Sequence, residues 1–390
     1  MSEALVLIAP DKPTRRPPPP PSTVLVAPDK FKGSLSAAEV AAAVAAGIAE
    51  VRPEIPVRSL PVADGGDGTV EAVVSAGFRR LRTVVTGPAG QPVAASLAVR
   101  GDTAVVELAE ASGLHRLPGG PSKTLPLTAT SAGTGELIAA ALRAGRRRVV
   151  LGVGGSACTD GGAGMLTALG ARLLDAKGGD LPPGGAALLD LDRLDLSGLD
   201  PRLSEVDFEL ATDVDNPLLG TRGAAAVYGP QKGATPEQVE LLDRALHRWA
   251  SLVGTEHVDA PGAGAAGGVG FAALSLLGAK TRPGIEVVLD LLDFPAALRG
   301  ARLVITGEGS LDAQTLHGKA PSGVARAAGD VPVIAVAGRC LLSPPELAAA
   351  GFRAAYALSG LEPDPTRSMA DAARLLRRQA AQLARDHLQG

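Results

Sequence analysis

Four short apolar segments of this chain each end in a loop rich in glycine and acidic residues, and this pattern limits the folds open to it. The segments cover residues 57–62, 148–153, 206–211 and 302–305, and their length is typical of buried strands. The loops after them are Ala63-Asp64-Gly65-Gly66-Asp67-Gly68-Thr69, Gly154-Gly155-Ser156-Ala157-Cys158-Thr159-Asp160-Gly161-Gly162, Thr212-Asp213-Val214-Asp215-Asn216-Pro217 and Thr306-Gly307-Glu308-Gly309-Ser310-Leu311-Asp312. Because an open α/β sheet binds its ligand at the loops after its strands, we expect a ligand site there.

The residue types in these loops suit phosphate and metal chemistry. Glycine lets the backbone bend and approach a ligand closely. Backbone N–H groups in such loops bind phosphate, and carboxylates bind Mg²⁺. The alternative is four ordinary turns between strands and helices, but the shared chemistry of all four favours one active cleft.

Composition excludes several classes of function. Only 2% of the residues are aromatic, which argues against surfaces that stack nucleic-acid bases, and the net charge of −3 provides no basic field for nucleic acid or anionic lipid. No run is long and apolar enough to span a membrane. The two cysteines, Cys158 and Cys340, lie far apart in sequence, which suits a reducing cytoplasm and no disulfide framework.

The order of predicted elements indicates two domains. Residues 24–27 predict a strand, Ser36 begins a helix with a capping box, and the strand before Asp64 is followed by a helix from Thr69, so this region reads βαβα as in a parallel sheet. Three short strands at 82–86, 93–99 and 103–108 then predict an antiparallel meander. The C-terminal region, with strands at 302–305 and 331–337 and helices at 322–328 and 368–388, returns to the βαβα pattern, so we expect it to complete the first sheet.

The order of these predicted elements gives an expected division of the chain into domains. Residues 1–22 form a disordered, dispensable extension with a polyproline run. Residues 23–81 and 300–390 form a discontinuous parallel-sheet α/β domain, and residues 82–299 form an inserted mixed α/β domain with the meander. Inside the insert we expect helices at 134–144, 162–173 and 235–252, with mostly loop at 181–202.

Known nucleotide motifs are absent or incomplete. The chain has no Walker A sequence and no protein-kinase glycine-rich loop, and it has no Gly-x-Ser-x-Gly. The run from Gly262 to Gly267 matches the dinucleotide fingerprint, but no convincing strand precedes it, so close packing or a ligand-facing loop is the better interpretation. The acidic loops remain, together with Lys30, Lys32, Lys232 and Lys319 beside glycines. This set favours phosphoryl transfer over a phosphatase or a phosphosugar isomerase, which need fewer such groups.

The chain resembles the type I glycerate kinase family from about Thr23 to the C-terminus. The resemblance rests on eight ordered motifs: Pro28-Asp29-Lys30-Phe31-Lys32-Gly33-Ser34-Leu35-Ser36, the Asp64 loop, Gly154-Gly155-Ser156-Ala157, Asp160-Gly161-Gly162-Ala163-Gly164-Met165, Asp213-Val214-Asp215-Asn216-Pro217-Leu218, Gly229-Pro230-Gln231-Lys232-Gly233-Ala234, Gly264-Ala265-Ala266-Gly267-Gly268, and Gly307-Glu308-Gly309-Ser310-Leu311-Asp312 with Gly318-Lys319-Ala320-Pro321. It departs at Cys158-Thr159, where Thr-Asn is common in the family, and at Thr212, where Cys is frequent.

The resemblance implies ATP- and Mg²⁺-dependent phosphorylation of a hydroxyl of D-glycerate in a cleft between two α/β domains, one of them flavodoxin-like. Its partners are then a small-molecule substrate, with no nucleic acid and no membrane, and a homodimer is one option for its assembly. A non-catalytic regulator that binds a nucleotide or a sugar acid on the same fold is the alternative. The sequence does not say whether O2 or O3 of glycerate accepts the phosphoryl group.

Candidate roles follow from the matching positions. The catalytic candidates are Asp64, Asp215 and Lys32, with Asp64 preferred as general base, Asp215 next, and a metal role as the rival for both. The substrate candidates are Asp29, Ser34, Arg282, Asp312 and His317. The nucleotide or phosphate candidates are Gly65, Gly66, Gly68, Thr69, Gly155, Ser156, Lys232, Gly307 and Lys319, and the metal candidates are Asp67, Asp213 and Glu308. For the charged groups the alternative is a structural ion pair, for Asp215 an Asx turn, and for His317 a plain surface position.

Overall fold

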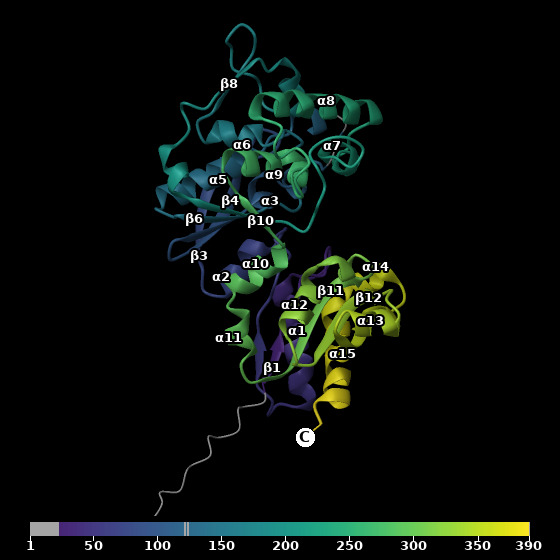
Figure 1. Ribbon diagram of the computed structural model, residues 1–390. Helices are drawn as coiled ribbons and strands as arrows, with labels where there is room; N and C mark the ends of the chain where they lie inside the picture. The colour runs from purple at the N-terminus through teal and green to yellow at the C-terminus, as the bar shows by residue number, and fades with distance from the viewer. Residues whose placement is uncertain (1–22, 121, 123–124, 390) are drawn as a thin grey trace, which may run out of the picture.

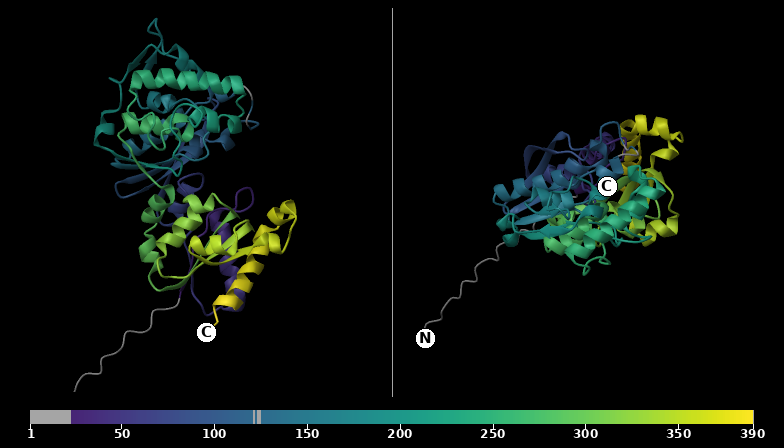
Figure 2. Two further views of the ribbon diagram at one scale, coloured as in Figure 1. Left: turned by 45° about the vertical axis from the view of Figure 1, so that its right-hand side comes forward. Right: turned by 90° about the horizontal axis from the view of Figure 1, so that it is seen from above.

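The computed structural model describes residues 23–120, 122 and 125–389, which form two lobes that each surround one sheet (Figure 1). The extension expected to be disordered, residues 1–22, lies outside the described residues. The first lobe combines the beginning and the end of the chain, and the second lobe contains its middle, as Figure 2 also shows. The expected α/β architecture is therefore confirmed, with one large sheet in each lobe.

The sheet of the first lobe has five parallel strands in the order β13-β12-β11-β1-β2. Their bounds are Phe352–Ala357, Val333–Cys340, Ala301–Leu311, Thr23–Val26 and Val57–Ser59. Counted along the chain, this is the flavodoxin-like order 2-1-3-4-5, whose ligand crevice opens where the order reverses. That switch point lies between β1 and β11, which pair in parallel with Val24 opposite Leu303. The expectation that the C-terminal region completes the first sheet is confirmed.

Helices cover both faces of this sheet because side chains of a strand alternate between faces. Val24 and Val26 share a core with α1 (Ala37–Val51) and α15 (Ala372–His387), while Leu25 faces the core that contains α12 (Ala320–Ala327). The capping box predicted at Ser36 is present, with its hydroxyl accepting from the Glu39 N–H. The remaining elements of this lobe are α13 (Pro344–Ala349), α14 (Pro365–Ala370), η5 (Thr315–His317) and η6 (Leu358–Gly360).

The sheet of the second lobe has six strands in the order β10-β9-β6-β5-β4-β3. Their bounds are Lys280–Arg282, Asp207–Ala211, Arg148–Gly152, Thr103–Glu107, Pro92–Arg100 and Arg79–Thr86. Strands β5, β6, β9 and β10 are parallel, and β3, β4 and β5 form the predicted antiparallel meander. The outer face of this sheet shares a core with α3 (Leu108–Ser112), α5 (Ala132–Arg143), α6 (Ala163–Ala168), α8 (Pro236–Val253) and α9 (Ala265–Leu276).

Two expectations for the second lobe need correction. The helix expected at 162–173 is α6, which ends at Ala168 because Gly170 adopts a left-handed φ of 108° that turns the chain. The next residues form β7 (Arg172–Leu174), which pairs with β8 (Arg193–Asp195) inside the region expected to be mostly loop. The rest of that region contains only η2 (Gly185–Asp190) and η3 (Pro201–Glu205).

Helices α2 (Thr69–Ser75) and α10 (Gly284–Leu291) lie between the two sheets (Figure 1). Val73 of α2 and Val288 of α10 belong to one apolar core that also includes Val150 of the second sheet and Val304 of the first. The lobes therefore share a core, and the domain boundaries expected at residues 81 and 300 stay predictions. The short elements α4 (Leu125–Thr128), α7 (Ala224–Tyr228), α11 (Phe294–Leu298), η1 (Leu114–Arg116) and η4 (Pro230–Lys232) complete the chain. Within the described part, no helix has the length and apolar character needed to cross a membrane.

Candidate active site

A cleft of about 800 Å³ opens between the lobes at the carboxyl ends of the first sheet's strands. Its walls include Asp29 after β1, Glu308 on β11 and Gly155 after β6, so both lobes contribute. A second pocket of about 210 Å³ lies beside it and reaches the loop after β9. The two pockets share Asp64, Gly66, Gly154 and Gly155. The site therefore lies at the switch point of the first sheet, and loops of the second lobe form part of its walls.

Backbone contacts hold the loops of the two lobes together at this junction. A Cβ atom added to Gly154 would lie 2.5 Å from the Cα atom of Gly66, and one added to Gly284 would lie 1.9 Å from the carbonyl oxygen of Asp64. Since any side chain would collide with backbone there, glycine is required for the loops to approach. These glycines thus place the Asp64 loop against both β6 and the start of α10.

Several carboxylates face one another in the cleft. The pKa of Asp29 is raised to about 7, mainly by burial; the charges of Asp64 and Glu308 contribute to the rise, and Lys30 opposes it. Burial also raises the pKa of Glu308, whose Oε1 accepts a 2.5 Å hydrogen bond from Thr315. Such mutual repulsion indicates a site that gains from a bound cation.

Asp213 extends this acidic group into the smaller pocket. Its Oδ1 accepts a 2.8 Å hydrogen bond from the backbone N–H of Gly284. Loss of hydration raises its pKa to about 7, and the charge of Asp64 contributes to that rise. Because Asp213 is exposed, water screens its charge, and its pKa shift corresponds to a smaller free-energy effect than that of Asp29.

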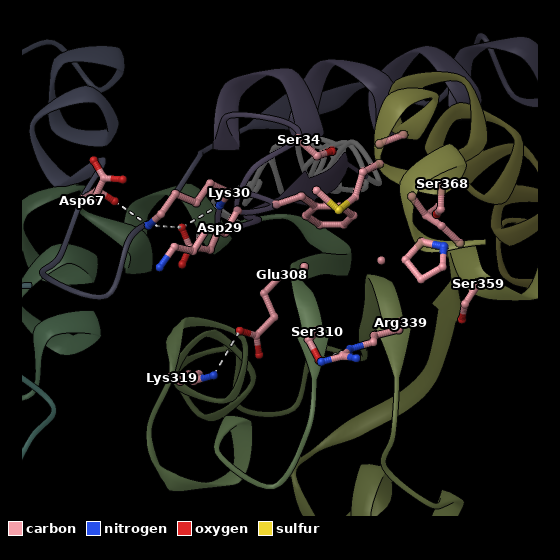
Figure 3. Close-up of a pocket in the computed structure, with 18 of the residues that line it drawn as sticks. Asp29, Lys30, Ser34, Asp67, Glu308, Ser310, Lys319, Arg339, Ser359 and Ser368 are labelled. Atoms are coloured by element: carbon pink, nitrogen blue, oxygen red, sulfur yellow. Dashed lines mark hydrogen bonds and ion pairs between the residues drawn. The ribbon is translucent and has the colours of Figure 1, made fainter. Parts of the chain in front are cut away.

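Two lysines stand among these acids (Figure 3). The Nζ atom of Lys30 donates a 2.5 Å hydrogen bond to the carbonyl oxygen of Asp67 and lies 3.7 Å from Oδ1 of Asp29. The Nζ atom of Lys319 lies 3.9 Å from Oε2 of Glu308 and 3.8 Å from Oδ1 of Asp312. Both ammonium groups therefore border the cleft in places where they could contact phosphate oxygens.

The structure brings many of the predicted residues together. Those that line the main cleft are Asp29, Lys32, Ser34, Asp64, Gly66, Asp67, Gly155, Glu308 and Lys319. Those that line the smaller pocket and not the main cleft are Gly65, Ser156 and Asp213. Asp64 lines both pockets, and its charge acts on Asp29, Lys30, Asp213 and Glu308, so it is the electrostatic centre of the site.

Besides Asp312, three charged candidates lie outside both pockets. Lys232 is fully buried, and its Nζ donates a 2.5 Å hydrogen bond to the carbonyl of Cys158. The Arg282 guanidinium contacts Glu209 at 2.8 Å and Asp290 at 2.7 Å. The side chain of Asp215 is 79% exposed and lies 3.6 Å from Arg222. Each of these side chains contacts a protein group of opposite polarity. Such a contact is the structural role that the sequence left open as the alternative to binding a ligand.

The remaining candidates line neither pocket and lie in the loops and elements next to them. The Thr69 hydroxyl is buried and donates to the carbonyl of Gly66 at 2.7 Å, and the N–H of Gly68 donates to Glu107. Gly307 sits against β12, where an added Cβ atom would lie 2.1 Å from the carbonyl oxygen of Val336. Asp312 holds Lys319 beside the cleft without lining it, and His317 is the last residue of η5.

Sequence reasoning missed three polar groups at the site. The sequence places Lys30 beside glycines but assigns it no role in the site, whereas in the structure it is the lysine nearest Asp29. Glu107 is 2% exposed and accepts hydrogen bonds from the N–H groups of Gly68 and Val70, and burial raises its pKa to about 7. Arg339 lines the cleft, and its Nε donates to the Ser310 hydroxyl at 3.0 Å. For Glu107 a signal existed, because it closes a predicted strand as the other acids do.

The predicted metal candidates do not converge on one point. Among the described residues, no three His, Cys, Asp or Glu side chains are arranged to hold a metal ion. Mg²⁺, however, is usually held by one or two carboxylates together with phosphate oxygens and water. The separate carboxylates around this cleft fit that mode of binding and not a cage built from protein alone.

Comparison with known proteins gives a consistent picture. A model of the glycerate kinase family matches residues 24–388. The chain is 52% identical to a glycerate kinase of Bacillus subtilis over 81% of this chain and 84% of the relative, and 48% identical to a glycerate 2-kinase of Escherichia coli with the same coverage. A crystal structure from Salmonella typhimurium LT2, provisionally named glycerate kinase 2, is 46% identical with a TM-score of 0.79, covering 94% of this chain and 98% of that one.

Proposed function

The chain belongs to the glycerate kinase family, and we propose that its cleft binds ATP and D-glycerate and transfers the γ-phosphoryl group to a glycerate hydroxyl. Membership of a kinase family favours an enzyme over the non-catalytic regulator that the sequence left open. The observation that carries the proposal is the group of charges beside the junction of the two pockets. There the charge of Asp64 helps to raise the pKa values of Asp29 and Glu308, and Lys30 and Lys319 lie beside these two acids.

Phosphoryl transfer depends on positioning and on stabilising charge that spreads over phosphate oxygens. The ammonium groups of Lys30 and Lys319 supply positive charge on either side of the junction. Lys32, exposed on the rim, can contact the outer phosphates of the nucleotide. Gly154 and Gly155 line the same space, and backbone N–H groups of such loops can donate to phosphate.

Asp64 is the proposed general base. It lines both pockets, so it can reach a hydroxyl held at the junction. As the hydroxyl oxygen bonds to the γ-phosphorus and the bond to the β–γ bridging oxygen breaks, the hydroxyl proton passes to the Asp64 carboxylate. The products are then phosphoglycerate and ADP, with the proton on Asp64 until it is released to water.

Mg²⁺ bound with the nucleotide would neutralise part of the phosphate charge. One or two of Asp67, Asp213 and Glu308, each of which lines one of the pockets, would hold it together with phosphate oxygens and water. Their carboxylates offer the hard oxygen ligands that this ion prefers. With these carboxylates bound to Mg²⁺, Asp64 would remain free to accept the proton of the reacting hydroxyl.

A coupled assay of ADP release from ATP, Mg²⁺ and D-glycerate tests the proposal, with L-glycerate and no acceptor as controls. We expect turnover that needs both Mg²⁺ and D-glycerate, and ³¹P NMR of the product then distinguishes transfer to O2 from transfer to O3. Absence of acceptor-dependent ADP release would sink the proposal. The cytoplasm is the proposed compartment, in keeping with two cysteines that are both free.

A further inference from the structure

The main cleft has a second half that the proposed chemistry does not use. Away from the acids it is bounded by the segment from η6 to the start of α15 and by the loop after β1. The side chains that line this half are mainly apolar or hydroxylic: Phe31, Ser34, Leu358, Ser359, Pro363, Pro365, Ser368, Met369 and Ala372, with Glu362 beside them. We call this half the distal arm.

The order of strands relates the distal arm to the acidic end. The cleft begins at β1 and β11, which carry Asp29 and Glu308, passes Arg339 on β12, and ends at η6, which directly follows β13. Neighbouring strands lie about 4.8 Å apart, so three spacings from β1 to β13 cover about 14 Å. Arg339 and Ser310 stand between the two ends (Figure 3). A ligand that spans the cleft therefore needs a charged end, a polar middle and an apolar end.

Two features of the distal arm point to a flat, partly polar ligand. Met369 is 50% exposed although it is large and apolar, and an added Cβ atom on Gly33 would lie 3.4 Å from its Cε, so it faces the loop after β1 across the arm. Its thioether can adapt to an aromatic surface. The Ser34 hydroxyl is buried and, within the described part of the chain, has no hydrogen-bond partner. A buried hydroxyl without a partner is unfavourable, so a polar edge of a ligand would satisfy it.

We infer that the distal arm binds the purine base and ribose of the nucleotide, with Met369 against the base and Ser34 as a hydrogen-bonding partner. This inference rests on the proposed function, because it takes the triphosphate to lie at the acidic end. Glycerate is a poor occupant of the arm, since a small anion gains nothing from apolar walls and is repelled by Glu362. A cleft of about 800 Å³ is also of the size that larger ligands occupy.

Calorimetry with two ligands tests the inference without requiring turnover. ADP carries the base, whereas tripolyphosphate carries phosphates alone. We expect Met369→Ala and Ser34→Ala each to weaken ADP binding about 5- to 20-fold and to leave tripolyphosphate binding within about twofold. The matched control is Val84→Ala, which shortens a side chain that is 69% exposed on β3 and lines neither pocket.

The outcomes separate the two proposals. Unchanged ADP affinity in both variants would overturn the inference, and so would an equal loss of ADP and tripolyphosphate binding, which would place these residues at the phosphates. If the wild-type protein turns over D-glycerate and the KM for ATP is unchanged in both variants, the distal arm is not the base site although the kinase proposal stands. If the wild-type protein binds ADP with the expected sensitivity to both variants but does not turn over glycerate, the inference stands and the kinase proposal fails.

Discussion

Replacing Lys30 with methionine should change how the stability of the folded protein depends on pH. Lys30 is the cation nearest Asp29, at 3.7 Å, and it holds down a pKa that burial raises to about 7. Methionine keeps much of the length and volume of the side chain but removes its charge. The experiment is done without Mg²⁺ or nucleotide, so that no bound ion contributes.

The size of the effect follows from the distance between the charges. At 3.7 Å and an effective dielectric constant of ~20, the attraction is about 4 kcal/mol as an upper limit, equivalent to roughly three pH units. Both side chains keep some contact with water, so we expect the pKa of Asp29 to rise by about one to three units in Lys30→Met. The pKa of Glu107, whose charge also acts on Lys30, would shift in the same direction.

The sign follows from proton binding. An Asp29 carboxyl whose pKa is about 7 when folded, against 3.8 ordinarily, binds more protons in the folded state between those values. Wild-type stability therefore falls as pH rises from about 4 to 7, by about 4 kcal/mol from this group, and is flat in this respect above pH 7. In Lys30→Met the fall continues above pH 7. Between pH 6 and 9 we expect the variant to lose about 1–3 kcal/mol more than the wild type.

Urea unfolding at intervals from pH 5 to 9 measures this difference. Lys32→Met is the matched control, because Lys32 lies two residues away in the same loop but is exposed, and its curve should run parallel to that of the wild type. Adding Asp29→Asn to Lys30→Met should remove most of the additional slope. Parallel curves for wild type and Lys30→Met from pH 6 to 9 would refute the assigned coupling.

Four further predictions concern the site and the chain around it. Asp64→Asn should lower kcat by ~10²–10⁴ while ADP affinity measured by calorimetry stays within a few-fold, and rescue by excess Mg²⁺ would instead make Asp64 a metal ligand. Gly284→Ala should cost about 1–3 kcal/mol in urea unfolding because its Cβ atom would meet the Asp64 carbonyl at 1.9 Å, whereas Gly360→Ala, with no atom within 4 Å, should be near neutral. Deleting residues 1–22 should leave Tm and kcat unchanged, since a proline run donates few backbone hydrogen bonds, and a large loss in either would contradict this. ADP and D-glycerate together should reduce the radius of gyration in solution scattering, because we expect the lobes to close over bound substrates. An unchanged radius would contradict this closure and would leave the proposed kinase activity untouched.

The elements that could be predicted from sequence are those whose signals are local. The capping box at Ser36 forms, because it involves groups only three residues apart. The presence of β1 and β11 in one sheet could also be anticipated, because the βαβα pattern recurs at both ends of the chain. Three of the acidic stretches follow strands and could be placed at the carboxyl ends of a sheet, where ligands bind. The fourth, with Glu308, was expected to be a loop but is the last part of β11, and the stretches come from two sheets that meet at the cleft.

What could not be predicted depends on partners far away in the sequence. Lys232 lies in a glycine-rich stretch that looks like a phosphate loop, yet its ammonium group contacts Cys158, 74 residues earlier. Arg282 finds Glu209 on the neighbouring strand, a contact set by sheet register and not by its own motif. The shared core around α2 and α10 was missed for the same reason, since neither helix shows in its own sequence that it will be covered on two sides.

The position of β1 in the middle of the first sheet has a consequence for the order of synthesis. One neighbour of β1 is made at once, but the other, β11, begins only at Ala301, after every strand of the second lobe. At roughly 5–20 residues per second, that interval lasts on the order of 10–50 s. Helix α1 waits still longer for α15, against which Gly47 packs so closely that a Cβ atom would meet the Arg377 carbonyl at 2.1 Å. Every strand of the second lobe is therefore synthesised before β1 can pair with β11 and before the apolar face of α1 can pack against α15.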